Sequence, residues 1–95
     1  MVMTKTLNEA IQDAAKTLRS FGATEVYLFG SRVTGEDTGE SDVDLAVRGL
    51  PDEVYYHAIA IASLALPVPL DVISLDDPGP FTNYLLAQGG LQRVA

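Results

Sequence analysis

The chain has 95 residues, 47% of them apolar and 20% charged, which is the composition of one globular domain over 1–95 rather than of a disordered segment. Thirteen acidic and six basic side chains give a net charge of -7, which repels phosphate backbones and argues against stable binding to nucleic acid. No cysteine and one histidine exclude thiol catalysis, cysteine-based zinc sites and a multi-histidine metal site. Carboxylates remain for metal or acid–base chemistry, and they favour hard ions such as Mg²⁺ or Mn²⁺.

The chain lacks the patterns of a membrane or exported protein. Its longest apolar run, 58–66, is about half of what a membrane-spanning helix needs, and it ends at Pro67. The first residues pass directly into a polar amphipathic pattern, without the apolar run and cleavage site of a signal peptide. We therefore expect a cytoplasmic protein with no membrane contact.

The first half of the chain predicts one helix followed by two strands. Thr6 and Glu9 form a capping box ahead of an apolar pattern of helical spacing over 7–20, and Gly22 fits the position just past the helix end. The β-branched, aromatic and other apolar residues of 24–29 and 43–48 predict two strands. Between them, 30–41 has loop composition, and structureless loops of that length are usually functional or disordered.

The second half predicts a helix from Asp52 to Leu66, which prolines 67 and 69 break. A strand over 70–75, a turn cluster and a short helix over 81–88 follow, and the tail 91–95 is left open, with a small edge strand as one option. This order, α-β-β-α-β-α, predicts an α/β fold: a short mixed β-sheet with helices packed on it.

The helix expected over 52–66 has an unusually broad apolar surface. Two apolar stripes lie side by side on it, wider together than one face of a sheet requires. The simpler interpretation is a well-buried helix, and the alternative is an interface with a helical partner. Tyr55, Tyr56 and Tyr84 are most simply packing residues.

Three aspartates lie in or beside the predicted strands. Asp42 and Asp44 are two residues apart and therefore project to the same face, while Val43 and Leu45 supply the core on the other. Adjacent carboxylates repel, and Asp71 lies in an otherwise apolar run, so each is unfavourable without a cation or another partner. Three carboxylates suit one or two Mg²⁺ ions, which usually also bind substrate phosphates.

Gly30, Ser31 and Arg32 follow the first predicted strand and have the chemistry of a phosphate-binding turn. The glycine permits close backbone approach, and the amides and the serine hydroxyl are donors for phosphate oxygens. Arg32 adds a permanent positive charge with a bidentate fork, and its place beside Ser31 favours phosphate contact over the alternative of an ordinary surface charge. No Walker A sequence is present.

Gly30-Ser31, ten intervening residues and Asp42-Val43-Asp44 together resemble the signature of the DNA polymerase beta-like nucleotidyltransferase superfamily, and Asp71 matches its third carboxylate. The local form is similar to the minimal nucleotidyltransferases. The resemblance implies the nucleotidyltransferase fold, with two Mg²⁺ ions held by Asp42 and Asp44. Asp71 would help to ligate one ion and to deprotonate an acceptor hydroxyl. Gly30 and Ser31 would hold the terminal phosphates of ATP, and the hydroxyl would attack the α-phosphate.

Many minimal nucleotidyltransferases are encoded with a helical HEPN-type RNase and act as its antitoxin. The resemblance thus implies transfer of AMP from ATP to a tyrosine hydroxyl of a HEPN-type toxin within a hetero-oligomer. One alternative is an antitoxin that masks its partner without catalysis, which the intact triad disfavours. Another is a small-molecule nucleotidyltransferase acting, for example, on an antibiotic, which ranks lower because the chain leaves little room for an acceptor pocket. No base-reading motif decides between ATP and other nucleotides.

Overall fold

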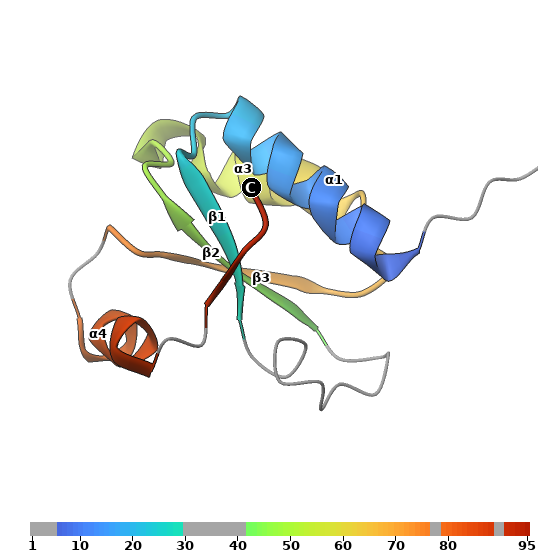
Figure 1. Cartoon of the computed structure of the whole chain (residues 1–95). Helices are drawn as coiled ribbons and strands as arrows, with labels where there is room; N and C mark the ends of the chain where they lie inside the picture. Colours follow the sequence, from blue (N-terminus) through green and yellow to red (C-terminus); the bar gives the residue numbers. More distant parts are fainter. Residues whose placement is uncertain (1–5, 30–41, 77–78, 89–90) are drawn as a thin grey trace, which may run out of the picture.

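The computed structural model describes residues 6–29, 42–76, 79–88 and 91–95. Its strands form one mixed four-stranded sheet in the order β3-β2-β1-β4. Strand β1 is antiparallel to both of its neighbours, whereas β2 and β3 run parallel. The elements (Figure 1) are α1 (Leu7–Ser20), β1 (Glu25–Phe29), β2 (Val43–Arg48), the 3₁₀ helix η1 (Asp52–Val54), α3 (Tyr55–Ser63), β3 (Leu70–Ser74), α4 (Pro80–Gln88) and β4 (Gln92–Arg93).

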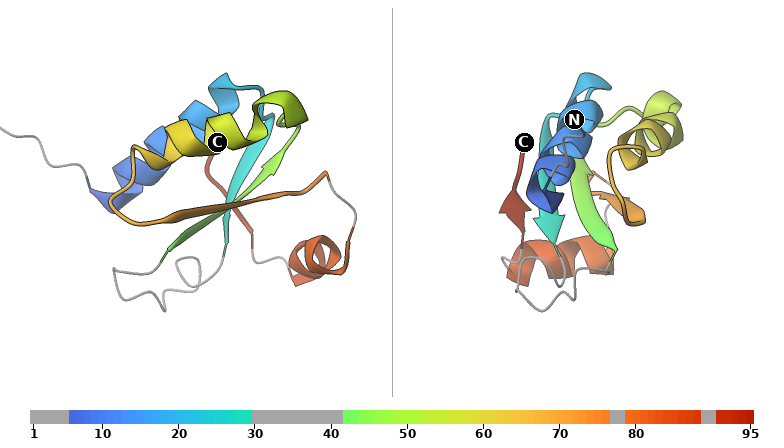
Figure 2. Two further views of the ribbon diagram at one scale, coloured as in Figure 1. Left: turned by 180° about the vertical axis from the view of Figure 1, so that it is seen from behind. Right: turned by 90° about the vertical axis from the view of Figure 1, so that its right-hand side faces the viewer.

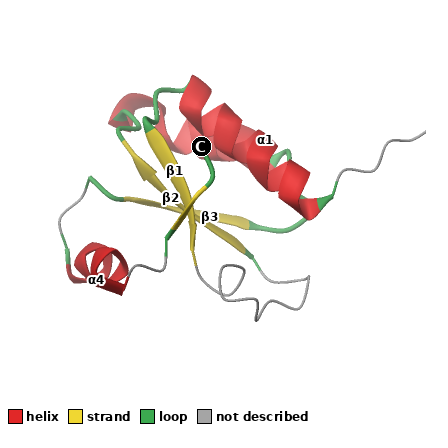
Figure 3. Cartoon of the chain, in the orientation of Figure 1, coloured by secondary structure: helices red, strands yellow, loops and turns green. Residues whose placement is uncertain are grey.

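Helices α1 and α3 lie side by side on one face of the sheet, and α4 lies on the other side of it, near one end (Figures 1 and 2). The main core fills the space between the sheet and the α1–α3 layer, and its members are aliphatic. They include Ile11, Ala14, Leu18, Val26, Leu28, Val43, Leu45, Val47, Ala58 and Ala62. Figure 3 shows this division into a helical layer and a strand layer. The mixed sheet with packed helices confirms the expected α/β fold.

Helix α1 has the predicted bounds, and local chemistry sets both ends. The Glu9 amide donates to the Thr6 hydroxyl at 3.1 Å, and the Glu9 carboxylate accepts from the Thr6 amide at 3.3 Å, which completes the capping box. Gly22, just past the end, has φ +124°, a backbone conformation that side chains with a Cβ rarely adopt. A Cβ there would also lie 2.8 Å from Cδ of Pro51, so a glycine is required on both counts.

The helix expected over 52–66 is shorter than predicted. Residues Asp52–Val54 form a 3₁₀ turn, and the α-helix ends at Ser63. After it, the Leu66 amide bonds the Ser63 carbonyl at 3.1 Å, a bond of the tighter i→i−3 kind. Pro67 explains this ending, because its ring disfavours the α conformation for the residue before it.

The other elements agree with expectation to within one residue, and the tail forms the edge strand β4. The packing role expected for Tyr56 and Tyr84 is wrong, since they are 82% and 59% exposed. Most of each side chain is in contact with water, although the ring of Tyr56 also packs edge-on against the ring of Tyr55. No helix in the described part of the chain is both long and apolar enough to cross a membrane.

Candidate active site

Strand β2 separates the core from the candidate site by its two-residue period. Val43, Leu45 and Val47 are fully buried against the α1–α3 layer. Asp44 belongs to the alternate set and therefore points to the opposite face, here called the open face. One strand thus supplies both the centre of the core and an acidic side chain outside it.

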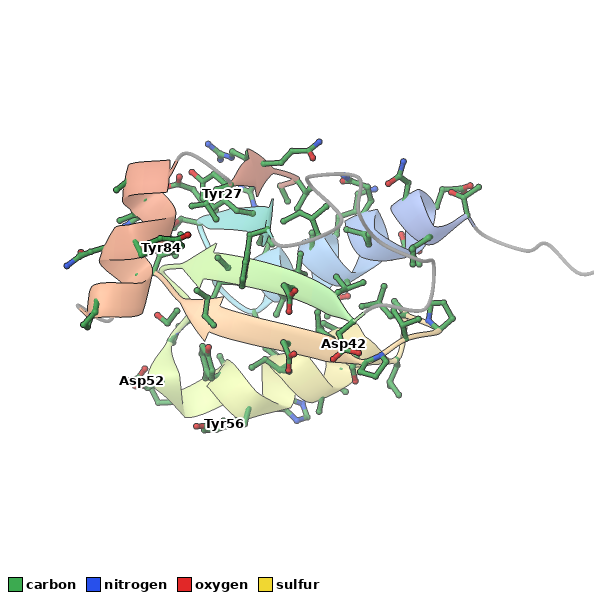
Figure 4. The ribbon with its side chains drawn as sticks, turned by 90° about the horizontal axis from the view of Figure 1, so that it is seen from below. Tyr27, Asp42, Asp52, Tyr56 and Tyr84 are labelled. Atoms are coloured by element: carbon green, nitrogen blue, oxygen red, sulfur yellow. The ribbon has the colours of Figure 1, made fainter. Side chains whose placement is uncertain are left out.

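The sheet register brings two of the three aspartates together. Asp44 of β2 is the register partner of Asp71 in the parallel strand β3, and of Phe29 in the antiparallel strand β1. Adjacent strands are about 4.8 Å apart, so the two carboxylates start from neighbouring points on the open face. Asp42 lies one residue before β2, at the end of the sheet far from α4 (Figure 4). The sequence prediction that these aspartates are neighbours agrees with the backbone.

The environment of Asp71 differs from the one expected. The sequence places it in an apolar run, which suggested a buried carboxylate that needs a partner. In the structure β3 is an edge strand and Asp71 is exposed, so water solvates it and burial imposes no penalty. The apolar character of the run belongs to its neighbours Val72 and Leu70, which pack against the main core.

The donor chemistry and the backbone of this site fit a hard divalent cation. All three candidate ligands, Asp42, Asp44 and Asp71, are carboxylates, the type that Mg²⁺ and Mn²⁺ prefer. As they stand, the side chains in the described part of the chain form no group of three acidic or imidazole ligands around a common point.

The expected phosphate-binding residues, Gly30, Ser31 and Arg32, lie outside the described residues. The flanking strands nevertheless fix where the segment 30–41 begins and ends. Phe29, the last residue of β1, is paired with Asp44, the second residue of β2. The segment therefore leaves and rejoins the sheet at the end that carries the aspartates.

A second polar cluster, which sequence reasoning missed, occupies the other end of the open face. The Tyr27 hydroxyl donates a short hydrogen bond to the Glu25 carboxylate. Arg48 Nε lies 3.5 Å from Glu25 Oε2, and Arg93 Nη1 lies 4.0 Å from Glu25 Oε1. The cluster ties β2, β1 and β4 together. In the sequence, the only indication of this cluster is that Glu25 and Tyr27 are two residues apart on a strand and therefore point to the same face.

These contacts shift two pKa values. The hydrogen bond from Tyr27, aided by the charges of Arg93 and Arg48, lowers the pKa of the Glu25 carboxyl. The same hydrogen bond raises the pKa of the Tyr27 hydroxyl, because ionisation would remove the donor and set two negative groups together. The cluster is therefore built for a charged Glu25 beside a neutral Tyr27.

Comparison of the sequence with models of known protein families identifies the family of this chain. The family model described as "Polymerase beta, Nucleotidyltransferase" matches residues 9–91, which is most of the chain. The chain belongs to the polymerase beta nucleotidyltransferase family. Its matched range includes the segment 30–41 and all three aspartates, so the resemblance noted in the sequence is confirmed at the level of the family.

Two solved structures share the fold of this nucleotidyltransferase domain. One is a crystal structure of a toxin–antitoxin with AMP-PNP, which is 21% identical with a TM-score of 0.70, over 95% of this chain and 73% of that one. The other is a toxin–antitoxin MntA-HpeT mutant, which is 19% identical with a TM-score of 0.66, over 96% of this chain and 73% of that one. No curated protein matches the sequence.

Proposed function

We propose that this nucleotidyltransferase domain is an antitoxin that transfers AMP from ATP to a tyrosine hydroxyl of a HEPN-type toxin. The observation that carries the proposal is the register of Asp44 with Asp71, beside Asp42, at the end of the sheet where segment 30–41 begins and ends. Nucleotidyl transfer needs acidic groups and phosphate donors together, and this end of the sheet supplies both by sequence. We also expect the protein to act in the cytoplasm.

Each residue has a defined role in the proposed reaction. Asp42 and Asp44 hold two divalent ions, with Asp71 as a further ligand to one of them. Bound Mg²⁺, or Mn²⁺ in its place, offsets the charge of the phosphates and of the attacking and leaving oxygens. Gly30 and Ser31 donate to the terminal phosphates of ATP. These groups hold the α-phosphorus in line with the acceptor.

Two residues complete the transfer itself. Asp71 accepts the proton of the tyrosine hydroxyl as its oxygen attacks the α-phosphorus. The bond from that phosphorus to the oxygen bridging the α- and β-phosphates breaks, and pyrophosphate leaves with the bond's electron pair. Arg32 offsets the charge that develops on the departing phosphates. The products are an AMP–tyrosine phosphodiester, pyrophosphate and a protonated Asp71.

The partner and the nucleotide are proposed from three lines of support. The fold is shared with chains of toxin–antitoxin structures, one of which contains AMP-PNP. The MntA-HpeT mutant carries two aspartate-to-glutamate changes two positions apart, which is the spacing of Asp42 and Asp44 here. Finally, a net charge of -7 suits a protein acceptor better than a nucleic acid.

Intact mass spectrometry of the partner tests this proposal. A helical HEPN-type protein from the same host is co-expressed with the unmutated chain or with its Asp42→Ala, Asp44→Ala double variant. We expect whole AMP units on a partner tyrosine with the unmutated chain alone. An unmodified partner that still co-purifies and is silenced would contradict transfer and establish masking. AMP on small hydroxyl compounds without any protein acceptor would instead establish a small-molecule enzyme.

A further inference from the structure

Helix α3 is apolar except for His57 and Ser63, yet it is only half covered. None of its residues, Tyr55–Ser63, is acidic, lysine or arginine, and only Ala58 and Ala62 are buried. Tyr56 is 82% exposed, and Leu64, just past its end, is 80% exposed. A surface helix of a soluble domain normally carries charged residues outward, so an apolar outer face indicates an uncovered contact surface.

The exposed residues form an ordered row. Tyr56, Ala60 and Leu64 are four residues apart, which puts them on one side of the helix, opposite the buried Ala58 and Ala62. Leu64 keeps helical dihedral angles, φ -65° and ψ -21°, so the row continues through it. Two large side chains with a small one between them form a notch that accepts a side chain of a second helix. We call these three residues the α3 row.

A groove of about 680 Å³ continues this row around the edge of the sheet. Tyr56 and Ile59 line its α3 side, Ile73 lines its β3 side and Pro80 begins its α4 side. An added β-strand is an unsuitable occupant, because the Tyr55 hydroxyl already donates to the Val72 carbonyl of the edge strand at 3.2 Å. A helix with protruding side chains fits the row and the groove together.

Charge selects among possible occupants. Asp52 is the only charged side chain that lines the groove within the described residues, and the neighbouring Glu53 is also exposed. Neither forms an ion pair with another described residue. A second copy of this chain would bring the same acids and another net charge of -7 to the contact. The surface therefore fits a different protein with an apolar helix and basic side chains at one end.

We propose that the α3 row and its groove dock an apolar helix of the partner, with partner lysines or arginines facing Asp52 and Glu53. The identity of the partner as a HEPN-type toxin rests on the proposed function. The α3 row lies on the core side of the sheet, whereas the groove runs around β3 to Ile73, which shares the open face with Asp71. A partner that fills both the row and the groove therefore reaches the edge of the face that carries the candidate site.

Affinity of the purified pair tests the docking surface. In the double variant Tyr56→Ser, Leu64→Gln, we expect the HEPN-type protein to bind at least about thirtyfold more weakly, because exposed aromatic and aliphatic anchors dominate such contacts. The matched control is Tyr84→Ser, Leu86→Gln on α4, whose side chains are 59% and 47% exposed. It should bind within about twofold of the unmutated chain. Circular dichroism confirms that both variants are folded.

A charge variant and a self-association measurement complete the test. Asp52→Lys with Glu53→Lys should weaken binding and flatten its dependence on salt, because attraction between opposite charges is screened by ions. Sedimentation equilibrium of the chain alone should show a monomer. A dimer that the α3-row variant dissociates would overturn the proposal in favour of a second copy.

The readouts separate failure of docking from failure of the proposed function. Unchanged affinity in the α3-row variant, with AMP still transferred by the unmutated chain, would overturn the docking surface and leave the function standing. Loss of affinity in that variant, with no AMP on the partner, would support the surface and contradict transfer. No binding by the unmutated chain would overturn the proposal outright.

Discussion

The two faces of strand β2 differ in burial and in chemistry around Asp44. On the core face, Val43, Leu45 and Val47 are fully buried under two helices. On the open face, Asp44 is only half-buried and stands opposite Asp71. Side chains of a strand alternate between its two faces. A one-residue shift of β2 in the sheet would therefore move the buried aliphatic residues out of the core and Asp44 into it. The core thus fixes the register that brings the aspartates together.

The two faces of β2 are expected to have different roles, one in stability and one in nucleotidyl transfer. Side chains on the core face should carry the free energy of unfolding and have little direct effect on transfer. The acidic side chains Asp44 and Asp71 on the open face should do the reverse, because neither is fully buried and like charges repel. Each of the following changes tests one side of this division.

The largest effect on stability is expected from Leu45→Ala. Leu45 is fully buried in the main core, so its truncation removes buried methyl groups and leaves a cavity, at a cost of about 2–5 kcal/mol. That is a large share of the roughly 5–15 kcal/mol available to a domain. Urea unfolding measures the loss. A change below about 1 kcal/mol would mean that the core face does not hold the strand in place.

Asp71→Asn should remove transfer and leave stability as it is. The side chain is exposed, so we expect the free energy of unfolding to change by no more than about 0.5 kcal/mol. Loss of a ligand and proton acceptor should reduce the transfer rate about a hundredfold or more. Urea unfolding and a timed transfer assay, run on one preparation, give both numbers. Full activity in this variant would remove Asp71 from the site.

Divalent cations should stabilise the unmutated chain. A ligand that binds only the folded state adds about 1.4 kcal/mol at a free concentration tenfold above its dissociation constant. We expect Mg²⁺ to raise the melting temperature, and a chelator or Asp42→Asn with Asp44→Asn to abolish the rise. Sodium chloride at matched ionic strength controls for screening. An equal rise in the double variant would place cation binding elsewhere.

The smallest effect concerns the cluster at the far end of the open face. Tyr27 has a raised pKa, so the stabilisation from its hydrogen bond is present below its ordinary value of 10.0 and is lost as pH rises through the raised value. Glu25 has a lowered pKa, so its contribution is present above its ordinary value of 4.5 and is lost as pH falls through the lowered value.

Glu25→Gln should bring the Tyr27 pKa back toward 10.0, as phenolate absorbance measures. Tyr27→Phe identifies which absorbance change belongs to that residue. Transfer activity should stay close to that of the unmutated chain in both variants, because the cluster lies away from the aspartates. A Tyr27 titration that Glu25→Gln does not move would show that another contact sets its pKa.

Sequence patterns predict most of this fold because its local signals agree with one another. The capping box of Thr6 and Glu9, the glycine at position 22 and the period-two alternation of β2 each specify one structure. The neighbourhood of the aspartates follows from the same alternation together with the family signature.

Other features depend on tertiary placement and could not be read from local patterns. Asp71 lies in an apolar run, but only the strand order makes β3 an edge and leaves the carboxylate in water. The apolar α3 suggested burial, yet a sheet covers only the side of a helix that packs on it, so Tyr56 and Leu64 on the far side face outward. The contacts of Arg48 and Arg93 with Glu25 join three strands, which no local pattern encodes.

Calorimetric titration with AMP-PNP and Mg²⁺ tests most directly whether the open face of β2 is the nucleotide site. The comparison uses the unmutated chain, the Asp42→Asn, Asp44→Asn double variant and, at the other end of the same face, Tyr27→Phe. We predict binding by the unmutated chain, at least about tenfold weaker binding by the double variant and unchanged binding by Tyr27→Phe. Equal affinity in a folded double variant would contradict the assignment of the site to these aspartates.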